Sequence, residues 1–300
     1  MPQHQAANTD HPSAGKTTKV EGPLGIIAGR GSLPVFIAEA AMRDGVPIHV
    51  VGIQGEADAS IERFPHTWIK WGEVGKIFNA LEQHGCHDLV IIGGVRRPSF
   101  KNIRMDLGAI KALPFLLGLR HGGDDHILSK IVRFFEQKGY RVHGAGDVLP
   151  ELLMPEGCLT ARAPSKEDET DMILAFEAVR LLGRLDIGQA AVVAHGYVLA
   201  VEAAEGTDAM LERCAEIKRR GRSHGNASGV LVKAPKPGQE ERVDMPTIGP
   251  ETIRKASEAG LSGIAVAAGH VLIAECKRTV DLANDKQLFL YGLEWDTQAE

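Results

Sequence analysis

The sequence predicts an α/β protein of two domains: an N-terminal Rossmann-like domain built on a parallel sheet, and a C-terminal mixed α/β domain. Three early apolar runs, Leu24–Ala28, Ile48–Ile53 and Leu89–Ile92, are continuous and do not alternate with polar residues. Continuous runs are typical of parallel strands whose two faces are both covered. The chain has 300 residues and 34 glycines, enough for two cores and for many tight strand–helix turns.

The N-terminal domain is expected to alternate strands with helices. Its first strand ends in the turn Gly29–Ser32, a helix follows through Met42, and Gly45 ends that helix before the second strand. This strand–turn–helix–strand unit is typical of nucleotide-binding α/β domains. The other elements expected here are helices at 73–84, 105–120 and 125–138 and a strand at 140–143.

The domain boundaries follow from changes in composition. Residues 1–22 are polar and are predicted to be a disordered extension, so the N-terminal domain spans 23–155. A linker is expected at 156–163, close to prolines and a glycine, and the C-terminal domain at 164–300.

The C-terminal domain is expected to begin with a helix over 167–182. Ser165 is a predicted N-cap, and Asp168 takes the N3 position of a capping box. The elements expected after it are strands at 188–193, 197–201, 229–232, 263–267 and 271–274, helices ending at 219 and 259, and a final helix and strand.

Composition and charge argue against several classes of protein. The net charge is −5 and no long basic run occurs, so no nucleic-acid partner is expected. The four cysteines are far apart and form no Cys-x-x-Cys pair, which favours reduced thiols in a cytoplasmic protein. No apolar run is long enough to span a membrane, and the N-terminus lacks the apolar segment of a secretory signal.

Two glycine turns follow strands of the predicted parallel sheet. Gly29 and Gly31 would let backbone N–H groups approach a phosphate at a helix N-terminus, although Pro34 breaks a full G-x-G-x-x-G pattern. The second turn, 93–97, carries two arginines that suit phosphate. A tight turn without a ligand is the alternative, and His49 stands where an acidic residue would bind the ribose of NAD.

The segment from Lys233 to Gly249 is a shaped loop because its prolines fix φ. It carries Lys233, Lys236, Arg242 and Asp244, the residue types that a phosphate-handling site needs. Ordinary solvated charges on a surface loop are the alternative.

Three further stretches each allow a structural and a functional interpretation. Asp124 and Asp125 open a helix and can either cap it or ligate Mg²⁺. The stretch 205–208 can cap the following helix or bind an anion at its N-terminus. The apolar run 105–119 is either core or a groove for an acyl chain.

Several phrases occur together and in order along residues 23–293. They are Leu-Gly-Ile-Ile-Ala-Gly at 24–29, Leu-Pro at 33–34, Gly-Lys-Ile-Phe at 75–78, Gly-Asp-Asp at 123–125, Gly-Arg-Leu-Asp-Ile-Gly-Gln at 183–189, Val-Leu-Ala-Val-Glu-Ala at 198–203, Glu-Gly-Thr-Asp-Ala-Met at 205–210, Lys-Ala-Pro-Lys-Pro at 233–237 and Arg-Val-Asp-Met-Pro-Thr-Ile-Gly at 242–249. In these phrases the chain resembles the LpxI-type UDP-2,3-diacylglucosamine pyrophosphatase family of lipid A biosynthesis.

The resemblance implies Mg²⁺-dependent hydrolysis of UDP-2,3-diacylglucosamine to 2,3-diacylglucosamine 1-phosphate (lipid X) and UMP, with the substrate held between two domains. It implies a cytoplasmic protein in peripheral contact with the inner membrane, and it leaves a homodimer open. The long polar N-terminus and Arg30, which stands where relatives often have a small residue, are departures from the family pattern.

The resemblance implies that Asp244 is catalytic and that Gly29, Gly31, Gln189, Thr207 and Lys233 bind the substrate. From their residue types, Lys233 is also a candidate catalytic residue, Arg242 and Thr247 are candidates for substrate binding, and Asp244, Asp124 and Asp125 are candidate metal ligands. Phe100, Leu113, Phe115 and Leu116 are candidates for an acyl channel. Two alternatives remain open: a nucleotide-dependent oxidoreductase, and a nucleotide-sugar sensor without catalysis.

Overall fold

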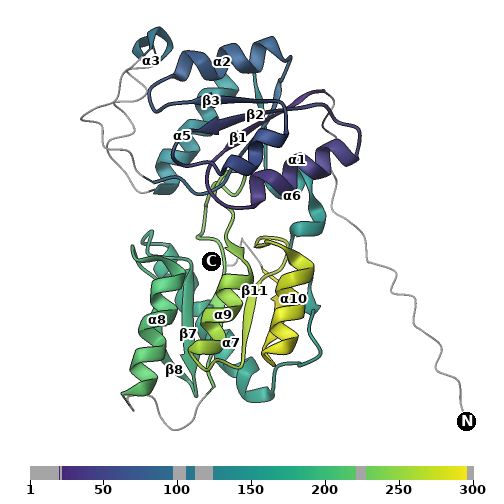
Figure 1. Cartoon of the computed structure of the whole chain (residues 1–300). Helices are drawn as coiled ribbons and strands as arrows, with labels where there is room; N and C mark the ends of the chain where they lie inside the picture. Colours follow the sequence, from purple (N-terminus) through teal and green to yellow (C-terminus); the bar gives the residue numbers. More distant parts are fainter. Residues whose placement is uncertain (1–19, 21, 97–105, 112–123, 221–227, 296–300) are drawn as a thin grey trace, which may run out of the picture.

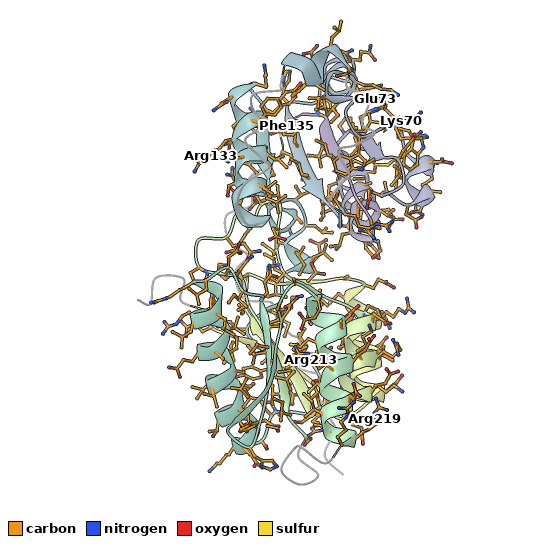
Figure 2. All side chains as sticks on the ribbon, turned by 90° about the vertical axis from the view of Figure 1, so that its left-hand side faces the viewer. Lys70, Glu73, Arg133, Phe135, Arg213 and Arg219 are labelled. Atoms are coloured by element: carbon orange, nitrogen blue, oxygen red, sulfur yellow. The ribbon has the colours of Figure 1, made fainter. Side chains whose placement is uncertain are left out.

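The computed structural model describes residues 20, 22–96, 106–111, 124–220 and 228–295. Two domains lie one above the other (Figure 1). The view turned by 90° agrees, with Arg133 and Phe135 on a helix of the N-terminal domain and Arg213 and Arg219 on a helix of the C-terminal domain (Figure 2). The α/β fold with two domains is therefore confirmed.

The N-terminal domain is built on a parallel sheet with the strand order β3-β2-β1-β4-β5. Its strands are β1 Leu24–Ala28, β2 Ile48–Ile53, β3 His66–Ile69, β4 Asp88–Ile92 and β5 Arg141–His143. Its helices are α1 Leu33–Arg43, η1 Ala59–Arg63, α2 Val74–Gln83, α3 Leu107–Lys111, α5 Asp124–Gln137 and α6 Ala145–Val148.

Both faces of this sheet are buried, which explains its continuous apolar strands. Along β1, Ile26 belongs to one apolar cluster and Ile27 to another, because successive side chains point to opposite faces. Strand β1 lies between β2 and β4, and ligands of open α/β sheets bind beyond the carboxyl ends of such strands. The fold therefore places the glycine turns after β1 and β4 side by side at one edge of the sheet.

The C-terminal domain is built on a mixed sheet with the strand order β6-β13-β11-β9-β7-β8. Its strands are β6 Gly157–Cys158, β7 Ala190–Ala194, β8 Tyr197–Val201, β9 Val230–Lys233, β11 Gly263–Ala267 and β13 Phe289–Leu293, and a separate parallel pair is formed by β10 Thr247–Ile248 and β12 Leu272–Ile273. Its helices are α7 Lys166–Gly183, α8 Gly206–Arg219, α9 Pro250–Glu258 and α10 Cys276–Asp285. The short η3 Pro150–Leu152 precedes them.

The linker expected at 156–163 is corrected by the structure. Leu152 packs in the N-terminal core and Met154 in the C-terminal core, so the chain crosses between the domains at this point. Gly157–Cys158 is strand β6, which pairs with β13. The backbone of this stretch forms sheet hydrogen bonds, and composition alone does not reveal that pairing.

The predictions for individual elements are confirmed in most of the described chain. The capping box before α7 is present, with Ser165 accepting from Asp168 N and Asp168 accepting from Ser165 N at 2.9 Å. Strands β3, β6 and β10 are absent from the sequence-based prediction. Most of the helix expected at 105–120 and of the extension expected at 1–22 lies outside the described residues, although Val20 packs against the N-terminal core.

No helix in the described part of the chain is both long enough and apolar enough to cross a membrane.

Candidate active site

Lys233 ends β9, the strand that lies between β7 and β11 in the C-terminal sheet. The preceding residues Val230–Val232 are fully buried, so the strand carries the lysine into the protein, where its exposed fraction is 9%. Its ammonium Nζ donates to Thr207 Oγ1 at 3.0 Å. Within the described residues this is its single hydrogen bond, so two of its three N–H groups have no protein acceptor.

Thr207 and Glu202 continue a chain of hydrogen bonds that begins at Lys233. Thr207, in the first turn of α8, donates its hydroxyl proton to Glu202 Oε1 at 3.1 Å. The backbone N–H of Gln189 donates to the other carboxylate oxygen of Glu202 at 3.2 Å. Gln189 therefore acts here through its backbone, on a carboxylate that follows β8 and is 9% exposed.

Burial and nearby carboxylates act in opposite directions on Lys233. Desolvation lowers the pKa of Lys233 below its ordinary value, and the negative charges of Glu202, Asp208 and Asp244 oppose that effect. Lys233 thus contacts Thr207 at the N-terminus of α8, where the residue before the helix makes no side-chain capping hydrogen bond. Such a helix end attracts anions.

Asp244 is held by the loop in which it lies. Gln239 Nε2 donates to Asp244 Oδ2 at 2.7 Å, and Gln239 Oε1 accepts from Lys236 N at 2.7 Å. Lys236 also pairs with Asp186 at 2.5 Å. Gly183 lets this loop cross α7, because a Cβ there would lie 2.9 Å from Pro237 Cδ.

The same loop reaches into the N-terminal domain. Val243 packs against the cluster that contains Ile27, and Met245 against the cluster that contains Ala28. Asp244 lies between these two residues in the chain and is therefore at the domain junction. Figure 1 shows the segment rising from β9 toward the N-terminal sheet.

Arg242 joins the loop to α5 of the other domain. Its guanidinium donates to both carboxylate oxygens of Glu240, at 2.7 and 2.8 Å, and to Glu136 Oε1 at 2.7 Å. These partners raise the pKa of Arg242, Glu240 having the larger effect, and Arg242 in turn lowers the pKa of Glu240. Three of its five N–H groups are thus used within the protein.

The glycine turns of the N-terminal domain pack directly on each other. A Cβ on Gly29 would lie 2.6 Å from the carbonyl oxygens of Gly93 and Gly94, so only glycine fits. Gly31 has φ +97° and open space around it. Arg30, the departure from the family pattern, pairs with Glu56, whose side chain is 9% exposed, at 3.0 Å.

The remaining predicted site residues make no hydrogen bond with Lys233 among the described side chains. Thr247 Oγ1 donates to the carbonyl of Met245 at 3.2 Å. Asp124 and Asp125 open α5, about 16–18 Å along the helix from Glu136 at 1.5 Å per residue, and their side chains lie outside the described residues. The acyl-channel candidates Phe100, Leu113, Phe115 and Leu116 also lie outside the described residues.

The donor chemistry at the domain junction fits Mg²⁺, although it is not a complete cage. Among the described residues, no group of three or more His, Cys, Asp or Glu side chains could hold a metal ion. Mg²⁺ is commonly held by one or two carboxylates together with substrate phosphates. Asp244 supplies a carboxylate of that kind.

Two residues that contact predicted site residues, Glu202 and Gln239, were not among the residues predicted from the sequence. Glu202 lies within the phrase at 198–203, and its position directly after a strand was the available signal. Gln239 lies in the loop, but nothing in the sequence shows that its amide contacts Asp244.

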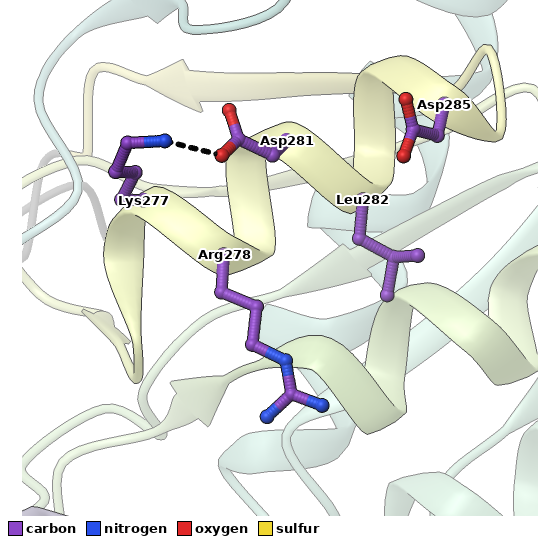
Figure 3. A pocket seen from close by; sticks show the side chains of 5 residues that line it. All are labelled: Lys277, Arg278, Asp281, Leu282 and Asp285. Carbon is purple, nitrogen blue, oxygen red and sulfur yellow. Dashed lines mark hydrogen bonds and ion pairs between the residues drawn. The ribbon is translucent and has the colours of Figure 1, made fainter.

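A surface depression on α10 lies apart from these predicted site residues. It is lined by Lys277, Arg278, Asp281, Leu282 and Asp285 (Figure 3). Lys277, 91% exposed, pairs with Asp281 on the same helix. Such pairs mark an ordinary solvated helix face.

Comparison with known proteins covers both domains. The model of the LpxI N-terminal domain matches residues 23–152, and that of the LpxI C-terminal domain matches residues 155–291. The chain is 43% identical over 273 residues to the UDP-2,3-diacylglucosamine pyrophosphatase LpxI of Caulobacter vibrioides, covering 90% of this chain and 97% of that protein. The chain therefore belongs to the LpxI family.

Proposed function

We propose that this protein hydrolyses the pyrophosphate bond of UDP-2,3-diacylglucosamine to give UMP and 2,3-diacylglucosamine 1-phosphate. Family membership over both domains and the identity to the Caulobacter LpxI support the reaction. The main structural support for this reaction is the buried ammonium of Lys233. Two of its N–H groups have no acceptor among the described residues, and it lies beside the N-terminus of α8, which has no side-chain cap.

The pyrophosphate carries negative charge that repels an attacking water. Lys233 and the backbone N–H groups of α8 would hold that charge and stabilise its increase in the transition state. Asp244 would orient the water and accept its proton, since Gln239 fixes the carboxylate through Oδ2. Two N–H groups of Arg242 have no acceptor among the described residues and would bind a phosphate oxygen, and the turn at Gly29 and Gly31 would hold the nucleotide.

Mg²⁺ is proposed as the cofactor, with Asp244 as a ligand and Asp124 and Asp125 as further candidates. When bound, it neutralises phosphate charge. We expect EDTA to abolish UMP release and added Mg²⁺ to restore it; full turnover in EDTA would remove the metal from the proposal.

The substrate has two acyl chains, which supports contact with a membrane surface. We propose peripheral binding to the cytoplasmic face of the inner membrane, with no spanning helix needed. Leu107 on α3, 78% exposed, is an apolar side chain suited to that contact.

The test is release of UMP from UDP-2,3-diacylglucosamine by the purified protein and by Asp244→Asn. We expect the variant to lose at least about 10²-fold in kcat, the range for a positioned acid–base group. Asp281→Asn on the exposed face of α10 is the matched control and should keep wild-type turnover. Wild-type rates from Asp244→Asn would remove Asp244 from catalysis.

The two alternative functions give different results in the same preparation. An oxidoreductase would bind NAD(P)H, which a fluorescence titration detects. A sensor without catalysis would bind the substrate and leave it intact. Sustained turnover of the lipid nucleotide, with no NAD(P)H binding, excludes both.

A further inference from the structure

Glu202 has a role that follows from the polarity of its hydrogen bonds. An ionised carboxylate only accepts, so the Thr207 hydroxyl must direct its proton to Glu202 Oε1. The lone pairs of that hydroxyl are then left for Lys233, which donates to it at 3.0 Å. Glu202 therefore sets the donor–acceptor direction of both hydrogen bonds, from Lys233 to Thr207 and from Thr207 to Glu202.

The position of Glu202 is itself tightly constrained. Its backbone N–H donates to Ala190 O at 2.8 Å, and its Oε2 accepts from Gln189 N at 3.2 Å. Gly188, with φ +56°, lies against it, since a Cβ there would be 2.1 Å from the Glu202 carbonyl oxygen. Both carboxylate oxygens are engaged, so the group is held in one orientation.

We propose that Glu202 is a positioning residue: it holds the Thr207 hydroxyl as an acceptor for Lys233 and thereby aims the two remaining N–H groups of the ammonium at the pyrophosphate. This role rests on the proposed function. Glu202 does not touch the reacting atoms; it acts through Thr207 and Lys233, whose buried charge it also balances.

The test is a double-mutant cycle with Glu202→Gln and Thr207→Val, measuring kcat and KM for UMP release. Each single variant should lower kcat about 10- to 100-fold, the worth of a hydrogen bond to a charged group, with KM little changed. The double variant should be no slower than the slower single variant, because both substitutions disrupt the same series of hydrogen bonds. Thr207→Ser keeps the hydroxyl and should restore most of the activity.

Controls separate this role from a loss of folding. Glu216→Gln, at an exposed position near the end of α8, should behave as wild type, and thermal unfolding of each variant reports its stability. Wild-type kcat from Glu202→Gln, additive losses in the double variant, or a Thr207→Ser as slow as Thr207→Val would each overturn the positioning role. A wild-type protein without turnover would instead overturn the proposed function, and this role with it.

Discussion

At the scale of single residues, glycines decide how closely the parts of the site approach. Gly29 gives the turn after β1 contact with the turn after β4, and the two backbones exchange hydrogen bonds between Arg30 and Gly94 at 2.8 and 3.0 Å. Gly31 is needed for a different reason. Its φ is positive, and other residues adopt that conformation only with strain.

The two glycines should therefore respond differently to substitution by alanine. Gly29→Ala forces the two turns apart and should lower both the thermal stability and the affinity for substrate. Gly31→Ala meets no neighbour, and its cost should be limited to about 1–2 kcal/mol of backbone strain. Thermal unfolding and KM measure both effects; a Gly31→Ala less stable than Gly29→Ala would contradict this assignment.

At the scale of elements, the loop that follows β9 joins the two domains. Pairing of Lys236 with Asp186 anchors its start to the C-terminal domain, and pairing of Arg242 with Glu136 anchors its middle to α5. His270 also pairs with Glu241 at 2.8 Å, and this partner raises the pKa of the histidine. Asp244 thus depends on contacts with both domains.

The two ends of the Arg242 network should differ in their effect on stability. Glu136→Gln removes a half-exposed pair, worth about 0.2–1 kcal/mol. Arg242→Gln also leaves Glu240, only 18% exposed, without its bidentate partner, and should cost about 1–3 kcal/mol. Urea unfolding gives both values. Equal losses would show that Glu240 gains little from Arg242.

At the scale of the whole molecule, the N-terminal domain carries a buried histidine that resists protonation. His49 is 2% exposed, stacks on His84 at 3.7 Å between ring centroids, and shares a hydrogen bond of 2.9 Å with Thr67. Among the described residues, its Nδ1 is a buried side-chain atom with no hydrogen-bond partner. Burial, with smaller effects of His84 and His66, lowers the pKa of His49 to about 4.

Acid should therefore destabilise the fold through His49. The unfolded chain binds this proton near pH 6.5 and the folded one near pH 4, so the stability present above pH 6.5 is lost as the pH falls from 6.5 toward 4. His49→Gln should flatten the dependence of the unfolding temperature on pH in that window. His87→Gln, at an exposed position, is the control, and an unchanged slope in His49→Gln would exclude His49 as the cause.

Much of this fold could be predicted because its signals are local. Continuous apolar runs gave β1, β2 and β4, and the Ser165–Asp168 pair gave the start of α7. Strands β3 and β6 escaped prediction, because His66–Ile69 and Gly157–Cys158 are strands through pairing with β2 and β13. A two-residue strand has almost no propensity of its own.

The sequence by itself determined the fold class, the family resemblance and the charged residues of the loop, because each depends on residue types and their spacing along the chain. Only the tertiary structure decided which of these groups meet. Lys233 ends β9, Thr207 lies in α8 and Glu202 follows β8, and they come together because β7 lies antiparallel to both β8 and β9. Contacts between distant residues are set by how the elements pack, which no local pattern encodes.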